Sequence, residues 1–211
     1  MNKDKIILDL CGGTGAWSKP YKDAGYDVLV WTLPSVDLNY YDFCAETYLS
    51  QVCGRNVFKV YGILATPPCT MFSFARSTAK SPRDFEGAMI LVKKCLDIIW
   101  HFRTNYNLKF WALENPMGYL RQFLGKPPLT FDPCDFGNGY TKKTDLWGYY
   151  NIPKKNPVKL TNQEMRDCSI NNRILPNIPK DYTMPHNMTK QSVRRAITSQ
   201  GFAQAFYKAN K

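Results

Sequence analysis

The feature that most limits the possible folds is a short apolar run that ends in a glycine-rich turn. The run Lys5–Leu10 has the length of a buried strand, and Cys11–Gly15, with the sequence CGGTG, follows it at once. A helical stretch to about Ala24 and a second apolar run, Asp27–Trp31, come next. A strand, a tight turn, a helix and another strand begin a parallel α/β sheet, and the sequence predicts that class.

The same alternation continues toward the middle of the chain. Val57–Ala65 and Phe110–Leu113 are further strand-like runs, and Phe85–Thr104 between them has apolar residues at helical spacing. This order predicts a mostly parallel sheet with helices on both faces. Three tryptophans lie in apolar patterns and are expected in the core: Trp100, Trp111 and Trp147.

The second half of the chain changes character. Residues 150–188 contain five prolines and no regular periodicity, so we expect a small, basic, loop-rich insert there. Helical spacing returns in Ser192–Asn210. A chain of 211 residues is suited to one domain, which we expect to consist of residues 1–149 and 189–211.

The chain is strongly basic, with 28 lysines and arginines against 17 acidic residues and a net charge of +11. A compact domain with this charge usually meets a polyanion, and the basic residues gather in particular loops. We therefore expect a nucleic-acid partner. A charged surface that serves solubility alone is the alternative.

The cysteines and histidines point to neither a metal site nor a disulfide framework. The seven cysteines have no paired spacing, and His101 and His186 lie far apart. No apolar stretch is long enough to cross a bilayer, and the first residues lack the apolar region of a signal peptide. We expect a soluble, cytoplasmic protein with no metal and no membrane partner.

The glycine turn is suited to hold a ligand. Asp9 stands near the end of the strand, and Gly12, Gly13 and Gly15 allow a ligand to approach the backbone closely. The turn has neither the lysine of a P-loop nor the GxGxxG spacing of dinucleotide folds. It is similar to the S-adenosylmethionine loop of class I methyltransferases, with an ordinary tight turn as the alternative.

A cysteine follows the third strand-like run. Two prolines restrict the backbone immediately before Cys69, which places it at the carboxyl end of a strand, where open α/β sheets carry their sites. Positive charge favours a reactive thiolate, and Arg76, Lys80 and Arg83 follow in the sequence. A buried thiol that only fills the core is the alternative.

Glu114 and Asn115 directly follow the fourth run. A carboxylate at a buried strand end is costly unless it is paired or functional, although a strand-end salt bridge would also explain it. The segment between Cys69 and Glu114 leaves room for one crossover helix. Both residues are therefore expected at the same edge of the sheet, beside the glycine turn.

At these positions the chain resembles the DNA cytosine-5 methyltransferases, most of all the short forms encoded by phages and bacteria. Five stretches match the family's motifs in the family's order and together span about 1–149 and 189–211. They are Asp9–Gly15 (DLCGGTG), Thr66–Ser73 (TPPCTMFS), Leu113–Pro116 (LENP), Phe136–Trp147 (FGNGYTKKTDLW) and Arg194–Phe206 (RRAITSQGFAQAF).

The resemblance implies a Rossmann-like class I fold, S-adenosyl-L-methionine as cofactor and double-stranded DNA as partner, in a bacterial or phage-infected cell. It implies that Cys69 attacks C6 of a flipped-out cytosine while Glu114 holds N3, so that C5 accepts a methyl group. Asn115 would hold the cysteine loop in shape, and Arg76 and Lys142 complete the expected catalytic set. The terminal motif would return a helix to the cofactor side.

The same resemblance assigns two sets of binding residues. The expected cofactor-binding residues are Asp9, Leu10, Cys11, Gly12, Gly13, Gly15, Trp17, Thr32, Asp37 and Pro67. The expected nucleic-acid-binding residues are Ser73, Arg76, Lys80, Arg83, Lys142, Lys143, Thr144, Lys154 and Lys155. The segment 70–84 is the expected mobile loop that closes over the base.

The chain departs from the family's pattern at two places. Thr32 follows the second strand where the family usually has a carboxylate for the ribose hydroxyls, and Asp37 is the substitute that we expect near the adenine end. Lys142 and Lys143 stand where the family has arginines, and a lysine lacks the planar fork of a guanidinium.

The insert is much shorter than the recognition domain of family members that read DNA sequence. It carries further basic residues, namely Lys154, Lys155, Lys159, Arg166 and Arg173. We expect binding dominated by phosphate contacts, with short or relaxed sequence preference.

Three alternatives remain at the level of sequence. The same chemistry could act on RNA or on a free pyrimidine nucleotide. A modified sulfonium cofactor could supply a group other than methyl. A nucleic-acid-binding protein without activity is the third.

Overall fold

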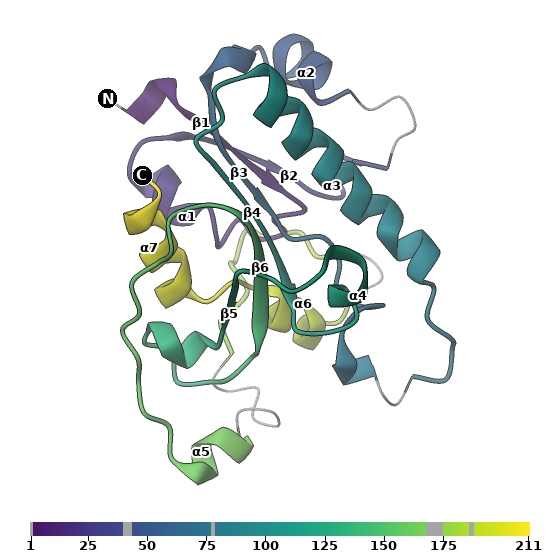
Figure 1. Ribbon diagram of the computed structural model, residues 1–211, viewed down its shortest axis with the longest axis vertical. Coiled ribbons are helices and arrows are strands. Elements are labelled where there is room, and N and C mark those ends of the chain that lie inside the picture. Colours follow the sequence, from purple (N-terminus) through teal and green to yellow (C-terminus); the bar gives the residue numbers. More distant parts are fainter. Residues whose placement is uncertain (1, 40–43, 77–78, 168–174, 186–187) are drawn as a thin grey trace.

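The computed structural model describes residues 2–39, 44–76, 79–167, 175–185 and 188–211 (Figure 1). Its six strands form one sheet in the order β2-β1-β3-β4-β6-β5. The strands are β1 (Ile6–Leu10), β2 (Asp27–Trp31), β3 (Val60–Ala65), β4 (Phe110–Pro116), β5 (Leu129–Phe131) and β6 (Thr144–Tyr149). The helices are α1 (Lys19–Asp23), α2 (Ala45–Thr47), α3 (Phe85–Asn105), α4 (Arg121–Leu124), α5 (Asn162–Asp167), α6 (Lys190–Ala196) and α7 (Gln200–Ala209).

The sheet is mostly parallel. Strands β1 to β4 run in one direction, whereas β6 is antiparallel to both β4 and β5. A parallel sheet with one reversed strand near its edge is the Rossmann-like fold of class I S-adenosylmethionine-dependent methyltransferases, which confirms the predicted fold class. The hairpin of β5 and β6 was not among the predicted strands. We call the edge at which β1, β3 and β4 end the carboxyl edge, and the opposite edge the amino edge.

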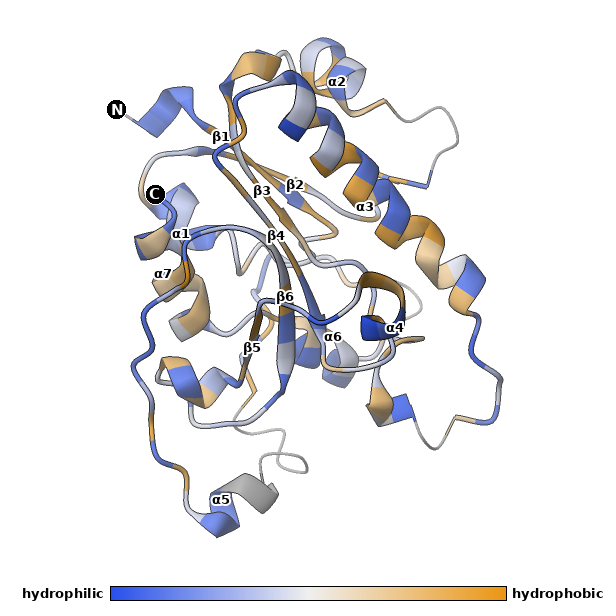
Figure 2. Ribbon diagram, in the orientation of Figure 1, coloured by the Kyte–Doolittle hydropathy of each residue, from blue (hydrophilic) through white to orange (hydrophobic). Residues whose placement is uncertain are grey.

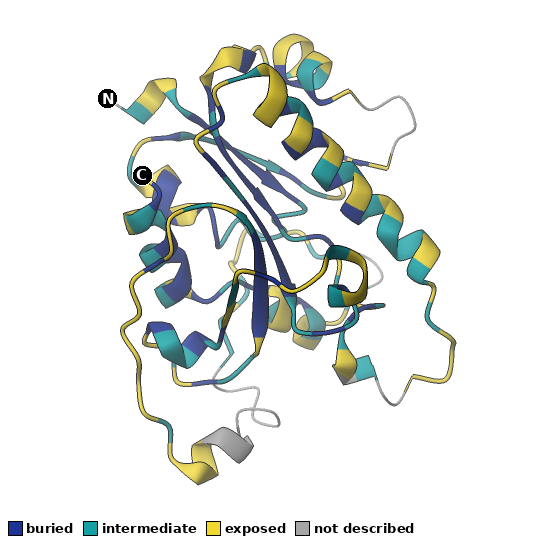
Figure 3. Ribbon diagram, in the orientation of Figure 1, coloured by how far each residue is buried: buried dark blue, intermediate teal, exposed yellow. Residues whose placement is uncertain are grey.

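Helices cover both faces of the sheet, with α3 on one face and α1 and α7 on the other (Figure 1). Side chains of β1 alternate between the two layers, as the period of a strand requires. Ile6, Leu8 and Leu10 pack in the α3 layer, whereas Ile7 packs in the α7 layer with Phe202. The central strands β1, β3 and β4 are accordingly mostly buried between helices whose outer surfaces are exposed (Figure 3), and β1 and β3 are mostly apolar (Figure 2).

Helix α3 begins where Asp84 accepts a hydrogen bond from the backbone of Gly87 at 2.8 Å. Its buried residues are Val92, Cys95, Ile98, Ile99 and Phe102. The expectation that Trp100 lies in the core is wrong, because its side chain is 69% exposed. Tertiary packing selects the face of the helix that carries Cys95, which is buried, so Trp100 faces solvent. Trp147 is buried and Trp111 is half-buried, in agreement with the prediction.

The predicted C-terminal helix is two helices. Helix α6 ends at Ala196, Ile197 is extended, and α7 begins after Ser199. The break allows α7 to approach the segment before β6, where the Gly201 N–H donates to Asn138 at 3.1 Å. A Cβ atom on Gly201 would overlap the Phe136 carbonyl oxygen, so the approach requires glycine. The helix near the glycine turn is also shorter than predicted, since tight turns precede Lys19.

The first part of the insert is hydrogen-bonded to the core. The Asn156 and Val158 N–H groups donate to the carbonyls of Asp135 and Cys134 at 2.9 and 2.8 Å. Helix α5 projects from the body of the molecule (Figure 1). In the ranges that the structure describes, no helix combines the length and apolarity needed to cross a bilayer.

A buried ion pair fixes the start of β6. Asp145 has no exposed surface, and both of its oxygens accept from the guanidinium of Arg121 at 2.6 Å. Thr130 of β5 donates to the same carboxylate at 2.8 Å. The pair therefore joins α4, β5 and β6 where β6 lies opposite Asn115.

We expect Arg121→Ala to lower the free energy of unfolding by about 3 kcal/mol, because it leaves a buried carboxylate without its cation. Urea denaturation measures this change. The matched control is Lys19→Ala. Lys19 and its partner Asp23 have side chains that are 67% and 54% exposed, so this change should lower the free energy of unfolding by less than about 1 kcal/mol. Equal losses in the two variants would contradict the prediction.

Candidate functional site

Three loops meet at the carboxyl edge because the parallel strands are in register there. Leu10 pairs with Ala65, and Ala65 pairs with Leu113, so the residues that follow them lie side by side. The Thr66 N–H donates to the Leu10 carbonyl at 2.9 Å, and its hydroxyl donates to the Cys11 carbonyl at 2.8 Å. The glycine loop (Cys11–Gly15) and the cysteine loop (Thr66–Ser73) are therefore joined directly, as the sequence predicts.

The glycine loop folds tightly over the end of β1. Cys11, Gly13 and Gly15 have φ values of 56°, 54° and 68°, and the Gly15 N–H donates to the Gly12 carbonyl at 2.9 Å. A Cβ atom on Gly12 would overlap the Asp9 carboxylate. At Gly13 it would meet only the Tyr182 hydroxyl, at 4.0 Å, so the outer surface of the loop is open to a ligand.

Asp9 lies beneath the loop with no exposed surface. One oxygen accepts a hydrogen bond from the Ser18 hydroxyl at 2.5 Å, and the other has no partner among the described residues. Burial raises the pKa of Asp9 to about 7. The carboxyl group therefore ionises close to neutral pH.

The cysteine loop is fixed to β4. The Asn115 side-chain amide donates to the Pro67 carbonyl at 2.9 Å, which is the contact expected from the sequence. The Cys69 carbonyl accepts from the N–H groups of Phe72 and Ser73 at 3.0 and 2.8 Å. These bonds form a tight turn that begins at Cys69 and holds it at the edge of the sheet.

Glu114, Lys142 and Cys69 form one electrostatic group. Burial raises the pKa of Glu114, and the ammonium of Lys142, 3.7 Å from its carboxylate, opposes that rise. Burial also raises the pKa of the Cys69 thiol, which Lys142 lowers and Glu114 raises further. In the free protein the thiol is therefore held in its protonated form near neutral pH.

The cations expected to activate Cys69 have other contacts. Arg76 donates to the carbonyl and hydroxyl of Ser81 at 2.9 and 2.7 Å, so it closes its own loop and does not join the catalytic group. Arg83 donates to the Met71 carbonyl and lies over the Tyr119 ring at 4.8 Å. Lys80 is exposed. The cation beside the thiol is Lys142, and it was assigned from the resemblance, not from the residues around Cys69.

The motif Phe136–Trp147, which contains Lys142 and Lys143, lies at the carboxyl edge because β6 begins there. The Lys142 N–H donates to Asp132 at 2.8 Å, and the Lys143 ammonium lies 3.5 Å from the same carboxylate. Thr144 is buried and donates to the Lys142 carbonyl at 2.7 Å. Thr144 therefore shapes the turn and presents no surface to nucleic acid, contrary to its assignment as a contact.

A narrow cleft opens beside Glu114. Besides Glu114 and Lys142, Tyr140 and Ser199 line it, and neither was predicted. Burial raises the pKa of Tyr140 to about 12. Both residues lie within the matching motifs, and Ser199 reaches the cleft through the helix break before α7, which the periodicity of the sequence hides.

Several expected cofactor residues have no free side chain. Leu10 has no exposed surface and Trp17 is 1% exposed, its ring packed against Phe202 of α7. Both belong to the core, and α7 packs against α1, the helix that follows the glycine loop. Thr32 follows β2, and Asp37 is exposed and accepts from the Asn39 N–H at 2.9 Å.

The distal part of the insert lies against the glycine loop, where Tyr182 approaches Gly13. Arg194 of α6 donates to the carbonyls of Leu175 and Pro176 at 2.6 and 3.0 Å, which fixes this segment on the C-terminal helices. This position could not be predicted from the sequence, because long loops carry no periodicity.

Of the basic residues expected in the insert, Lys154 and Lys159 are exposed. Lys155 pairs with Asp135 at 2.9 Å. Arg173, His186 and residues 77–78 of the expected mobile loop lie outside the described residues. The described ranges contain no group of three metal-ligating side chains.

No protein-family model matches the chain, and no curated protein matches its sequence. One similar solved structure is the Entamoeba histolytica methyltransferase EhMeth, with 12% identity over 74% of this chain and a TM-score of 0.35. Another is Spodoptera frugiperda DNMT2 in a mutant form, with 17% identity over 86% and a TM-score of 0.36. The chain spans 56% and 57% of these two proteins. The likeness is too low to transfer the chemistry of either protein.

We expect the thiol pKa of Cys69 to respond in opposite directions to its two charged neighbours. Lys142→Gln removes a cation and should raise this pKa, whereas Glu114→Gln removes an anion and should lower it. Alkylation of the Cys69 peptide by iodoacetamide, followed against pH by mass spectrometry, measures both changes. The exposed Cys44 is the internal control, and its rate should not change. Shifts of the same sign would contradict the arrangement.

We expect Asp9 to make stability fall as pH rises from about 4 to about 7. The unfolded chain loses this proton near pH 3.8 and the folded chain near 7, so the folded state binds more protons between them. Ionisation in the folded protein should cost about 4 kcal/mol at pH 8.

Urea denaturation of wild type and Asp9→Asn at several pH values tests this expectation. The variant keeps an oxygen for Ser18 but has no proton to lose, so its stability relative to wild type should increase with pH. A constant difference between the two proteins would show that Asp9 titrates normally.

Proposed function

We propose that this protein methylates C5 of cytosine in DNA, with S-adenosylmethionine as methyl donor and Cys69 as nucleophile. The observation that carries the proposal is the convergence of Cys69, Glu114 and Lys142 at the carboxyl edge, directly beside the glycine loop. A thiol, an acid and a cation that lie close together in a buried site are the groups that this reaction needs.

The opposite effects of the neighbours on Cys69 suggest how the nucleophile forms. A proton that moves from the Cys69 sulfur to the Glu114 carboxylate leaves the charge of the pair unchanged. It produces a thiolate and a neutral acid, and both pKa values are raised by the same burial. The thiolate then keeps the stabilising charge of Lys142 and loses the repulsion of Glu114.

The two products of that transfer match the needs of a cytosine ring. The Cys69 thiolate forms a bond to C6 while Glu114 donates its proton to N3, so electron density develops at C5. Once C5 is methylated, loss of the C5 proton to solvent and rupture of the S–C6 bond restore the aromatic ring. The proton on N3 returns to Glu114 and then passes back to the Cys69 thiolate, so the enzyme regains the thiol and the carboxylate with which it started.

The glycine loop is suited to the cofactor, which would supply an electrophilic methyl group. Gly13 presents an open backbone surface, and one oxygen of the buried Asp9 has no partner in the described ranges. Tyr182 from the insert borders the same surface. The ribose contact of the family is not provided by Thr32, and Asp37 remains the proposed substitute.

DNA is the proposed substrate because the chain carries a net charge of +11 and its motifs resemble DNA methyltransferases. A base in a duplex must be flipped out to reach Cys69. The proposed DNA contacts remain Ser73, Arg76, Lys80, Arg83, Lys142, Lys143, Lys154 and Lys155. Those of them that are already paired inside the protein shape the surface that meets the DNA.

The first experiment is trapping on DNA that contains 5-fluorocytosine. Fluorine cannot leave as the C5 proton does, so a working enzyme should stall as a covalent adduct that survives denaturing electrophoresis. The adduct should require S-adenosylmethionine and should be absent in Cys69→Ala. Cys44→Ala, an exposed cysteine away from the cleft, should form it normally. Glu114→Gln should slow it by about a hundredfold or more.

Parallel assays with RNA and with fluorinated nucleotide separate the substrates. An adduct on RNA or nucleotide alone would keep the chemistry and reject DNA. An adduct in Cys69→Ala would reject the nucleophile. Binding of DNA without any adduct would favour the inactive nucleic-acid-binding alternative.

A further inference from the structure

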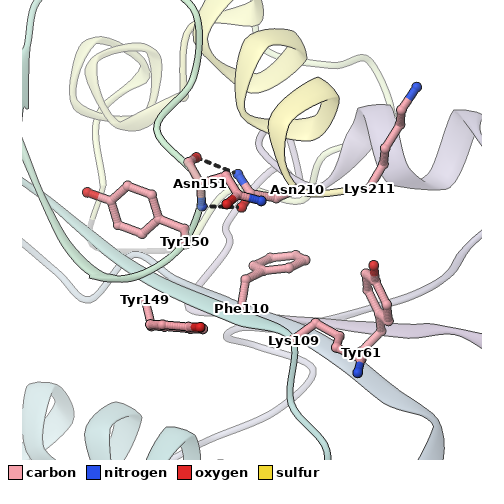
Figure 4. Close-up of a pocket in the computed structure, with 8 residues that line it drawn as sticks. All are labelled: Tyr61, Lys109, Phe110, Tyr149, Tyr150, Asn151, Asn210 and Lys211. Atoms are coloured by element: carbon pink, nitrogen blue, oxygen red, sulfur yellow. Dashed lines mark hydrogen bonds between the residues drawn. The ribbon is translucent and has the colours of Figure 1, made fainter.

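A second cavity lies at the amino edge, at the far end of the sheet from Cys69. It has a volume of about 250 Å³ and is larger than the cleft beside Glu114. We call it the tyrosine cavity, and Figure 4 shows its lining. The residues are Tyr61, Lys109, Phe110, Tyr149, Tyr150, Asn151, Asn210 and Lys211.

Half of the residues that line the cavity are aromatic. Tyr149 at the end of β6 is 58% exposed, and Tyr61 at the start of β3 is half-buried. Phe110, which is 2% exposed, forms the floor between them (Figure 4). Large rings at this edge therefore face solvent, where a flat ligand could stack on them.

The cavity is held open by hydrogen bonds. The Asn151 N–H donates to the Asn210 side chain at 2.7 Å, and that side chain donates back to the Asn151 carbonyl at 3.0 Å (Figure 4). The Lys109 N–H donates to the Tyr61 carbonyl at 2.9 Å. A preformed cavity loses little conformational freedom when a ligand enters.

Cations surround the rings. The Lys5 ammonium lies 4.4 Å from the Tyr61 ring centre, and the Arg103 guanidinium lies 4.6 Å from that of Tyr149. Lys109 is at the rim, and its side chain bonds only a neutral amide, Asn107, at 3.2 Å. Among the described residues that line the cavity, no side chain is acidic. The surroundings are therefore suited to an anion beside an aromatic group.

The exposed Trp100 extends this surface along α3. It lies one turn before Arg103, so the two side chains occupy the same face of the helix. At 69% exposure its indole contributes little to the core. Trp100, Arg103 and Tyr149 thus form an aromatic and cationic stripe that leads to the cavity.

We propose that the tyrosine cavity binds an unpaired nucleobase of a single-stranded nucleic acid. Tyr149 and Tyr61 stack on the base, and Arg103, Lys109 and Lys5 contact the flanking phosphates. Rings that alternate with cations along a groove are the arrangement by which proteins hold single strands without reading sequence. The site is separate from the methylation cleft, and its binding does not depend on methyl transfer.

Fluorescence anisotropy with labelled oligothymidine and oligouridine of about 12 nucleotides, without cofactor, tests the proposal. Tyr149→Ala should weaken binding about tenfold, the size of one lost stacking contact, and Trp100→Ala should weaken it to a smaller extent. Phe58→Ala is the matched control, because Phe58 is 76% exposed and contacts Tyr106, outside the cavity. Thermal melts check that each variant is folded.

Arg103→Gln should weaken binding and lower the number of counterions released on binding, measured from the salt dependence of the affinity, by about one. If the variants lose affinity for oligothymidine alone, the site is assigned to DNA, and if they lose affinity for oligouridine alone, it is assigned to RNA. Loss of affinity for both assigns the site to any single strand. The proposal is overturned if folded Tyr149→Ala and Trp100→Ala bind like wild type. It is also overturned if a blunt duplex binds as tightly as the single strands, with the same sensitivity to Tyr149.

Discussion

The parallel register of β1, β3 and β4 is the constraint on which the site depends. Pairing of Leu10 with Ala65 and of Ala65 with Leu113 places the ends of β1 and β3 beside Leu113, directly before Glu114 of β4. The loops that follow then lie in contact, although they are far apart in the sequence. A shift of one residue in any pairing would turn the side chains of that strand to the other face and separate Cys69 from Glu114. The hydrogen bond from Asn115 to Pro67 reinforces the register at the point where it matters for chemistry.

The pKa values of the ionisable groups at this edge depend on how deeply the groups are buried. Glu114 and Cys69 are both buried near Lys142, which lowers the pKa of each. Because both groups are buried, a single proton decides which of the two is charged. The buried Asp9 beneath the glycine loop is a separate case. Burial raises its pKa, and no cation is among the groups that shift this pKa.

Much of this arrangement could be predicted from the sequence, for physical reasons. Buried parallel strands are continuous apolar runs, so β1 to β4 and the edge at which they end were visible. The short hairpin of β5 and β6 was not, because strands of three and six residues with an internal glycine give a weak pattern. The outward position of Trp100 was missed because tertiary packing, not periodicity alone, selects the buried face of α3. The contacts of Arg76 and Arg83 with nearby backbone could not be read from charge spacing.

The reversed direction of β6 has a consequence for how such a chain can vary. Its first residues deliver Lys142 to the reactive cleft, whereas its last residue, Tyr149, leaves at the opposite edge. The connection to α6 must then travel back across the molecule, and its early part is already attached along the segment that precedes β6. An insertion after residue 158 would lengthen this connection without moving Lys142 or Tyr149. The fold thus separates the residues gathered at the carboxyl edge from the connection whose length can change.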